Sequence, residues 1–510
     1  MKKYIVWILA PLFLLCSCGL LETESDEKLS GDEFWDDGTT SDMEAFINSM
    51  YFSFRKATMQ NAVFILFSGD LRCAPISTNN DVSKKDWMYI NYLATNDLNG
   101  LKETYTDDNH IRADGIMRWK TFYEVVQQAN IMIKEILRAD ITEQEKESFK
   151  AEAIFIRCLT YFFMVRNFGD VPYYTEAYNQ VPLPRTDMIT VLGNISADLQ
   201  QLLDNDPDAQ ILPWTYTSLS KKATHATRAS VLALQMHVNM WLAGFDSNQA
   251  ATYYQKVVDC GNMLVDGNGG SYSLLPIEQT ATLFKGGSSE SIFEIAQNIS
   301  YSAGKEVFKK EAVFSNEVMY TCFSGQLRPN LYYTYDFMST AYPVDKTDDR
   351  IKYWFDENAY SSMATLPKEI VKFKNVDTYD GNSITSNAGN QIVFRLADAI
   401  LLYAEALAEL GTDDSKACEL LNRIRTRAHA PEVLLTGQEL KDCIYWERVR
   451  ELIGEGHYFY DLVRTGKVCD GSYCFHPMTR GNFKAGAWTW PISRSALDNN
   501  TNISLNLYWE

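Results

Sequence analysis

The residue whose chemistry is set most clearly by its neighbours is Cys18. Two lysines near the start precede an apolar run from Tyr4 to Leu15, and Cys16-Ser17-Cys18-Gly19 follows it. A basic start, a short apolar core and small residues at a cleavage point are typical of an export signal, and the run is shorter than the ~20 apolar residues of a membrane-spanning helix. The pattern predicts a lipoprotein signal peptide over residues 1–17 and a lipid anchor on Cys18. The alternative is a plain cleaved signal peptide in which Cys18 has no role.

Residue types that do catalytic chemistry are present, but not in recognisable arrangements. The sequence has no G-x-x-x-x-G-K phosphate loop, no H-E-x-x-H metal motif and no G-x-S-x-G nucleophile turn. Its six histidines are dispersed, and the acids Asp348 and Asp349 are adjacent, whereas glycosidase carboxylates face each other from separate elements. We therefore expect a binding protein without a metal or cofactor. A surface glycoside hydrolase with a concealed carboxylate pair is the alternative.

Cysteine spacing leaves one question open. Of the ten cysteines, eight remain once Cys16 is removed and Cys18 is acylated, and only Cys469 and Cys474 are close neighbours. Such a pair can close a disulfide in an oxidising compartment. Zinc would need two further ligands, and only His476 is nearby. A disulfide and free buried thiols both remain possible outcomes, and a metal is disfavoured.

Two long segments without helical periodicity contain many aromatic residues, near 69–104 and 284–360. Flat rings pack against the apolar face of a sugar, while charged groups at their edge hydrogen-bond to its hydroxyl groups. Core packing is the alternative for any single ring. The predicted saccharide site combines residues from both segments: Asp70, Arg72, Trp87, Tyr89, Tyr320, Tyr333 and Trp354.

Helical hairpins are predicted to hold these loops. Apolar residues recur with helical spacing over 41–55, 118–137, 143–168, 188–203, 227–242, 251–265, 394–410, 415–428 and 438–453. Thr142 and Glu145 have the spacing of a capping box at one helix start. The hairpins resemble tetratricopeptide units but lack a strict period. The expected fold is all-α dominated, a tetratricopeptide-like helical hairpin scaffold with long irregular loops and little β-structure.

Composition and charge bound the domain organisation and the partners. A chain of 510 residues with 46% hydrophobic content can bury a large core. Its net charge of −19 disfavours nucleic acid as a ligand. We expect an acylated acidic tether and the start of the fold over 18–40, followed by one globular domain over 41–510. That domain would comprise a helical-repeat part (41–275), an aromatic loop-rich part (276–390) and a C-terminal helical part (391–510).

Several motifs together resemble those of the SusD/RagB family of outer-membrane nutrient-binding lipoproteins. They are Phe34-Trp35, the segment from Ala151-Glu152-Ala153 to Phe168-Gly169-Asp170-Val171-Pro172, Pro184-Arg185, Arg395-Leu396-Ala397-Asp398, Asn422-Arg423-Ile424-Arg425, Glu455-Gly456-His457, Phe459-Tyr460-Asp461-Leu462 and Trp490-Pro491-Ile492. Departures are Tyr458 and Val463, where the family usually carries Arg. The nearby charged face of Glu447, Arg448, Arg450 and Glu451 is interpreted as a solvated or self-paired helix surface.

The resemblance implies a concrete function. It predicts a lipid-anchored protein of the outer membrane, facing the cell exterior, that captures an oligosaccharide without cleaving it. The ligand would pass to a partner barrel, a SusC-type TonB-dependent transporter. The same role with a peptide as ligand is the alternative within the family.

Overall fold

The computed structural model of this chain describes residues 31–59, 65–78, 91–101, 116–296, 331–360, 370–373, 376–379, 384–387 and 389–510. Cys18 and the signal peptide lie outside these residues. The first described element is the short helix α1 (Gly31–Asp36), which buries Trp35. Arg138 fastens α1 through ion pairs with Asp32 at 3.0 Å and Asp36 at 2.6 Å.

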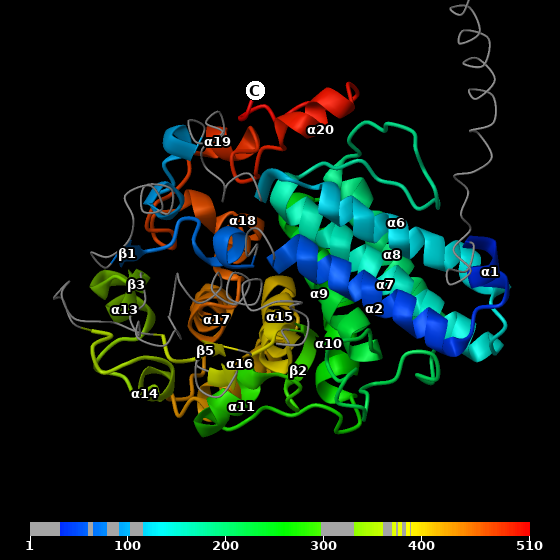
Figure 1. Cartoon of the computed structure of the whole chain (residues 1–510). Helices are drawn as coiled ribbons and strands as arrows, with labels where there is room; N and C mark the ends of the chain where they lie inside the picture. The colour runs from blue at the N-terminus through cyan, green and yellow to red at the C-terminus, as the bar shows by residue number, and fades with distance from the viewer. Residues whose placement is uncertain are drawn as a thin grey trace, which may run out of the picture.

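The N-terminal half is a stack of helices in which each packs against the next (Figure 1). The helices are α2 (Thr40–Met59), α6 (Lys120–Glu135), α7 (Glu143–Phe168), α8 (Met188–Asn205), α9 (Arg228–Phe245) and α10 (Ala250–Gly261). The predicted capping box at the start of α7 is confirmed, since Thr142 and Glu145 each accept a hydrogen bond from the other's backbone N–H. Local sequence therefore fixed where this helix begins.

The C-terminal half continues the stack. Its helices are α15 (Leu396–Leu410), α16 (Asp414–Arg427), α17 (Gly437–Glu451), α18 (Tyr458–Arg464), α19 (Arg480–Lys484) and α20 (Arg494–Asn499). Helix α15 packs against α9 and α10 of the N-terminal half. It ends at Gly411, whose φ of 64° is the left-handed conformation that glycine adopts readily.

The region between the two halves contains shorter elements. They are the helices α11 (Thr280–Lys285), α13 (Tyr335–Ala341) and α14 (Arg350–Trp354) and the 3-10 turn η4 (Ile277–Gln279). Other short elements lie within the two halves: the π-helical turns η1 (Ile65–Asp70) and η3 (Asn262–Asp266), and the 3-10 turns η2 (Ile136–Arg138) and η6 (Lys467–Cys469). Within the described residues, strands form three antiparallel pairs: β1 (Ile76–Thr78) with β3 (Leu331–Tyr333), β2 (Ser291–Ile295) with β6 (Gln391–Arg395), and β4 (Val376–Tyr379) with β5 (Ile384–Asn387). The expected helical fold with little β-structure is confirmed.

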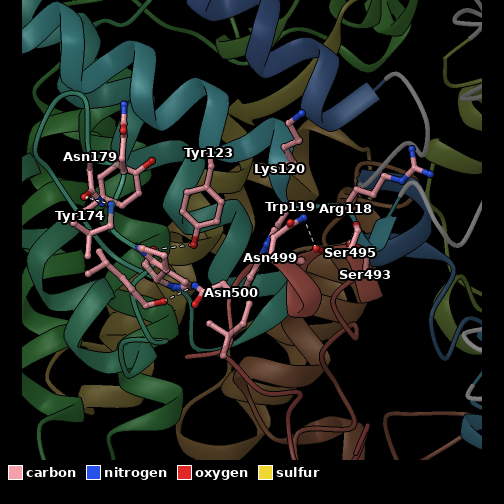
Figure 2. A pocket seen from close by; sticks show the side chains of 17 residues that line it. Arg118, Trp119, Lys120, Tyr123, Tyr174, Asn179, Ser493, Ser495, Asn499 and Asn500 are labelled. Atoms are coloured by element: carbon pink, nitrogen blue, oxygen red, sulfur yellow. Dashed lines mark hydrogen bonds between the residues drawn. The ribbon is translucent and has the colours of Figure 1, made fainter.

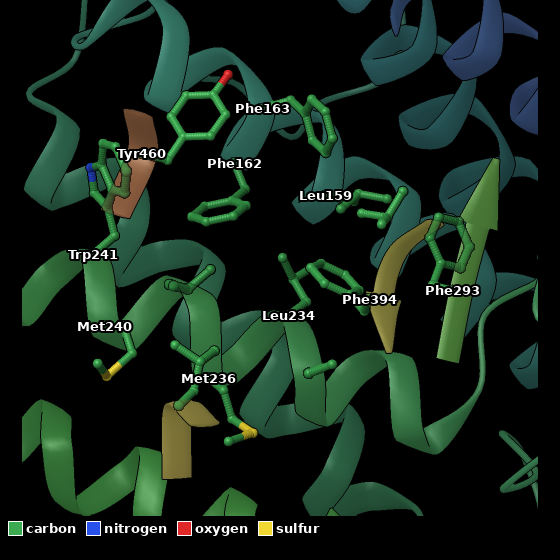
Figure 3. Close-up of a cluster of buried hydrophobic side chains, with 14 of the residues drawn as sticks. Leu159, Phe162, Phe163, Leu234, Met236, Met240, Trp241, Phe293, Phe394 and Tyr460 are labelled. Atoms are coloured by element: carbon green, nitrogen blue, oxygen red, sulfur yellow. The ribbon is translucent and has the colours of Figure 1, made fainter. Parts of the chain in front are cut away.

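One hydrophobic cluster extends through both halves of the chain. Figure 3 shows its centre, where Trp241 of α9 lies beside Phe162 of α7 and Tyr460 of α18. The Trp241 ring centroid is 6.4 Å from that of Phe162 and 6.0 Å from that of Tyr460. Such edge-to-face rings fill the space between helices and fix their relative positions. Among the described residues, none of the helices combines the length and apolarity that a bilayer-spanning segment needs.

Candidate functional site

A pocket of about 540 Å³ lies between the start of α6, the loop that follows α7, and α20 (Figure 2). Its volume is in the range that holds small ligands. The described residues that line it are Arg118, Trp119, Lys120, Tyr123, Pro172, Tyr174, Asn179, Gln180, Val181, Pro182, Leu183, Ser493, Ser495, Ala496, Asn499, Asn500 and Ile503. We call it the α6–α20 pocket.

Three aromatic rings form one wall of the α6–α20 pocket. Tyr123 and Tyr174 are nearly parallel, with centroids 6.0 Å apart and an interplanar angle of 13°. Trp119 meets Tyr123 edge to face at 5.7 Å. The Tyr123 hydroxyl donates to the Pro172 carbonyl oxygen at 2.8 Å, which holds the ring in place. Trp119 directly precedes α6 and has helical backbone angles, so its ring and that of Tyr123, four residues on, share a helix face.

Neutral polar groups form much of the rest of this lining. Asn500 Nδ2 donates to the Leu183 carbonyl oxygen at 2.9 Å, which fastens the loop to the C-terminal segment. Asn179 Oδ1 accepts from Val181 N at 3.1 Å. None of the described residues lining the α6–α20 pocket is acidic, and Lys120 stands at its edge with 86% of its side chain exposed. Rings beside amides and hydroxyl groups suit a saccharide.

A second pocket, of about 410 Å³, lies between α2, residues 220–225 and β2. Its polar groups already have partners within the protein. The Tyr51 hydroxyl donates to Glu152 Oε2 at 2.8 Å, and Lys221 Nζ lies 2.7 Å from Glu44 Oε1. Burial raises the pKa of Glu152 to about 7 and lowers that of His225 to about 4. The α6–α20 pocket is the better candidate, because it combines stacked aromatic rings with neutral amide and hydroxyl groups, whereas the second pocket is lined by an ion pair between Lys221 and Glu44.

Two residues of the predicted site, Asp70 and Arg72, lie inside the protein, each with 1% of its surface exposed. Arg72 Nη2 donates to the Ala487 carbonyl oxygen at 2.8 Å, and its guanidinium stacks on Phe459 at 4.4 Å. Asp70 Oδ2 accepts from Gly456 N at 2.6 Å, and burial raises the pKa of this carboxyl to about 8. These contacts correct the expectation of a ligand-facing loop: both residues fasten the N-terminal segment to the C-terminal one.

Tyr333 and Trp354 are also buried, with 6% and 0% of their surface exposed. Trp354 Nε1 donates to Thr280 Oγ1 at 2.9 Å, and Lys372 Nζ lies 4.0 Å from the ring centroid. Tyr333 packs against Phe337 at 4.9 Å between centroids. The expectation that these two rings face a ligand is thereby corrected, because both are part of the hydrophobic core.

The three other residues of the predicted site, Trp87, Tyr89 and Tyr320, lie outside the described residues. Sequence reasoning missed the pocket-lining rings: it assigned Trp119 and Tyr123 to a helix and gave Tyr174 no role. The four-residue spacing of the first two was the available signal. That these rings line one pocket with Asn500 depends on the tertiary fold.

The sequence indicated a solvated or self-paired surface for the charged face of α17. Arg450 Nη2 does pair with Glu447 Oε2 of the same helix at 2.9 Å, but the glutamates of this face are buried and not solvated. Glu447 and Glu451 are 0% exposed. Arg350 Nη2 lies 2.7 Å from Glu447 Oε1, and Arg395 Nη1 lies 2.8 Å from Glu451 Oε1. Burial alone would raise the pKa of Glu447, but guanidinium groups, above all that of Arg350, outweigh it and lower the pKa to about 2. We call these residues the buried ionic cluster, together with Glu455, which pairs with Arg395, and Lys372, which pairs with Glu455. The cluster joins α17 to the loop-rich region.

One group of side chains in the described part of the chain has a metal-like arrangement: His237, Asp398 and His457. Its carboxylate is already paired, since His237 Nε2 lies 2.6 Å from Asp398 Oδ2 and Arg448 Nη1 lies 2.9 Å from Asp398 Oδ1. A buried guanidinium beside the carboxylate repels a cation. The group therefore fits an ion pair between helices rather than a metal centre.

Comparison with known proteins identifies the architecture. A family described as "SusD family" matches residues 301–509, and one described as "Starch-binding associating with outer membrane" matches residues 21–236. The solved structure of a SusD homolog from Bacteroides thetaiotaomicron is 54% identical, covers 94% of this chain and 100% of its own, and superposes with a TM-score of 0.87.

More distant relatives agree. SusD-like protein P2 of Formosa agariphila is 26% identical and covers 99% of each chain. A structure named as a laminarin-binding SusD-like protein is 22% identical, covers 91% of this chain and 98% of its own, and has a TM-score of 0.69, which shows a shared fold. Because one relative is 54% identical over nearly the whole chain, the protein belongs to the SusD/RagB family.

Proposed function

We propose that this protein is a cell-surface glycan-binding lipoprotein. It captures an oligosaccharide and delivers it, without cleaving it, to a SusC-type TonB-dependent transporter of the outer membrane. A lipid on Cys18 anchors it to that membrane with the globular part facing the cell exterior. Family membership supports this role, as do the family description "Starch-binding associating with outer membrane" and the similar structure that is named for binding laminarin.

The observation that carries the glycan assignment is the ring wall of the α6–α20 pocket. Tyr174 and Tyr123 present a rigid aromatic surface, and Asn179 and Asn499 stand beside it. A pyranose ring has an apolar face of C–H groups and a rim of hydroxyl groups, so it can use both kinds of contact. In this proposal the pocket holds one end of an oligosaccharide.

The test is a calorimetric titration of the lipid-free protein, with residues 1–18 removed, against a panel of oligosaccharides. Tyr174→Ala should lower the affinity for the best ligand about tenfold or more, since it removes an aromatic contact worth roughly 1.4 kcal/mol. The matched control is Phe52→Ala, an exposed ring that lines the second pocket and should leave affinity unchanged. Binding of peptides with no response to any glycan would overturn the assignment.

Trp87, Tyr89 and Tyr320 remain proposed ligand contacts from the aromatic loops. The variant Trp87→Ala, measured in the same titration, distinguishes the aromatic loops from the α6–α20 pocket. If Trp87→Ala lowers the glycan affinity and Tyr174→Ala does not, the binding site lies in the loops. Delivery to a transporter is tested by detergent extraction and affinity purification of the tagged protein. A TonB-dependent barrel should co-purify with it, and Cys18→Ser should release the protein from the membrane fraction.

A further inference from the structure

A tyrosine beside the α6–α20 pocket keeps an exposed ring at a strained backbone position. Tyr178 lies in the loop between α7 and α8, one residue before Asn179, which lines the pocket. Its surface is 48% exposed, and its φ of 62° is in the left-handed region. Glycine and asparagine adopt that region readily, whereas a residue such as tyrosine does so at a cost in free energy. The backbone alone would favour glycine or asparagine at this position.

Three residues of α6 mark the path of this loop. Tyr123, Asn130 and Lys134 are spaced by seven and four residues, so they lie on one face of the helix. The Tyr123 hydroxyl donates to the carbonyl oxygen of Pro172 at 2.8 Å. Further along, Asn130 Nδ2 donates to the carbonyl oxygen of Tyr174 at 3.4 Å. The first arm of the loop therefore runs along this face, from the pocket toward the C-terminal end of α6.

Tyr178 lies at the far end of that path. Lys134 Nζ is 5.0 Å from the centroid of its ring, in a cation–π contact. Lys134 is eleven residues beyond Tyr123, which corresponds to about 16 Å along an α-helix. The ring wall of the pocket and the Tyr178 ring thus mark two ends of one helix face.

Both arms of the loop are held, and this fixes the place of Tyr178. Before it, Tyr174 N donates to the Tyr161 hydroxyl at 3.0 Å, and the same hydroxyl donates to the Tyr174 carbonyl oxygen at 2.8 Å. After it, the Leu183 carbonyl oxygen accepts from Asn500 Nδ2 at 2.9 Å. Tyr178 itself stands in the turn between the two arms.

Apolar packing within the protein does not account for the ring. Tyr178 lies outside the hydrophobic cluster on which Tyr173 and Tyr174 pack. Its neighbour Lys134 has 61% of its side chain exposed, and cation–π contacts at exposed sites are weak. Backbone strain of this kind is concentrated at sites that bind ligands. A ligand contact gives the exposed ring a role that internal packing does not.

We propose that Tyr178 is a second aromatic contact for the glycan, so that the protein binds a chain of sugars along α6 and not only a terminal residue. The inference rests on the proposed function, because it extends the oligosaccharide whose end the α6–α20 pocket holds. The exposed part of the Tyr178 ring offers an apolar surface on which a pyranose stacks. A separation of about 16 Å along the helix exceeds the length of a disaccharide. Only a longer chain therefore contacts both the ring wall and Tyr178.

The test is a calorimetric titration with the best-bound glycan as a series of increasing length, from the disaccharide to the hexasaccharide. In the wild-type protein the affinity should rise about tenfold once the chain reaches Tyr178, which is the size of one aromatic contact. Tyr178→Gly should abolish this rise and leave the affinity for the disaccharide unchanged. Tyr178→Phe, which keeps the ring, should retain the rise.

A stability measurement separates loss of the ring from damage to the fold. Tyr178→Gly should keep or raise the Tm, because glycine adopts the left-handed conformation without strain. A ring needed for folding would instead give a lower Tm, and that result would overturn the proposal. The hexasaccharide should also slow chymotrypsin cleavage after Tyr178 about threefold, while the disaccharide should not. Cleavage that the hexasaccharide leaves unchanged would contradict the contact.

Tyr174→Ala distinguishes failure of this inference from failure of the proposed function. It should weaken binding of every member of the series, because the ring wall contacts the end of each chain. If Tyr174→Ala does so and Tyr178→Gly leaves the whole series unchanged, the second contact is wrong and the pocket stands. If Tyr174→Ala leaves the whole series unchanged, the proposed site itself is wrong. An equal loss at all lengths in Tyr178→Gly would also overturn the inference, because it would not depend on chain length.

Discussion

Arg395 and Glu455 form a bidentate ion pair in the interior, with Nε donating to Oε2 at 2.7 Å and Nη2 donating to Oε1 at 2.8 Å. Glu455 also accepts from Lys372 Nζ at 2.6 Å. Removing one partner of a buried pair leaves the other charge without compensation. The pair therefore makes the buried ionic cluster a sensitive point for stability.

Glu455→Gln should lower the free energy of unfolding by about 3 kcal/mol, because Arg395 and Lys372 lose a shared negative charge. Urea unfolding followed by fluorescence measures the loss. The matched control is Glu419→Gln, which removes a surface carboxylate 3.2 Å from Lys416 and should change stability by less than about 0.5 kcal/mol. Equal effects of the two substitutions would contradict a structural role for the buried pair.

Acid should destabilise the protein by protonating buried carboxylates that form ion pairs with arginine side chains. The pKa values of Glu447 and Asp461 are lowered to about 2 in the folded state: burial opposes ionisation of both, but nearby Arg charges outweigh it. Unfolded carboxylates titrate near pH 4, so the unfolded state binds protons first as pH falls. The stabilisation is complete above about pH 5 and is lost as pH falls toward 2.

Calorimetric Tm values between pH 7 and pH 2.5 measure this loss, and we expect a steep fall below about pH 4.5. In Glu447→Gln the fall should be shallower, since one of the responsible groups no longer titrates. A Tm that stays constant down to pH 2.5 would show that these ion pairs do not couple to folding.

Two hydrogen bonds from asparagine side chains should hold the loop that borders the α6–α20 pocket in place. Asn500 Nδ2 donates to the Leu183 carbonyl oxygen at 2.9 Å, and Asn502 Nδ2 donates to that of Pro182 at 2.8 Å. Asn500→Ala should speed chymotrypsin cleavage after Tyr178, whose side chain is exposed, about threefold or more, because local opening becomes easier. Asn499→Ala is the control, since its Nδ2 bonds within α20. Identical cleavage rates for Asn500→Ala and Asn499→Ala would show that the Asn500 hydrogen bond does not hold the loop.

Close packing of α9 against α18 requires the absence of a side chain at Gly244. A Cβ atom at this position would overlap the carbonyl oxygen of Arg464. Gly244→Ala should therefore destabilise the protein by about 2 kcal/mol or more, measured by urea unfolding. The control is Gly193→Ala in α8, where a Cβ would meet no atom within 4 Å. That change should stabilise by about 0.5 kcal/mol, because alanine favours the helix. A stabilising Gly244→Ala would contradict the packing.

The sequence alone predicted much of the helical scaffold. Periodicity gave α7 with the same bounds that the structure has, and the capping box of Thr142 with Glu145 marked its first turn. These signals are local, because a helix bonds residues four apart and buries one face. The family resemblance also came from sequence, since its motifs stand in order along the chain.

Only the tertiary structure decided which side chains are buried and which meet. Trp354 and Arg72 look like loop residues in sequence, yet both lie in the interior. The burial of a ring or a charge depends on partners distant in the chain, and sequence spacing does not encode those distances. The same reason explains why the pocket formed by Trp119, Tyr174 and Asn500 emerged only from the fold.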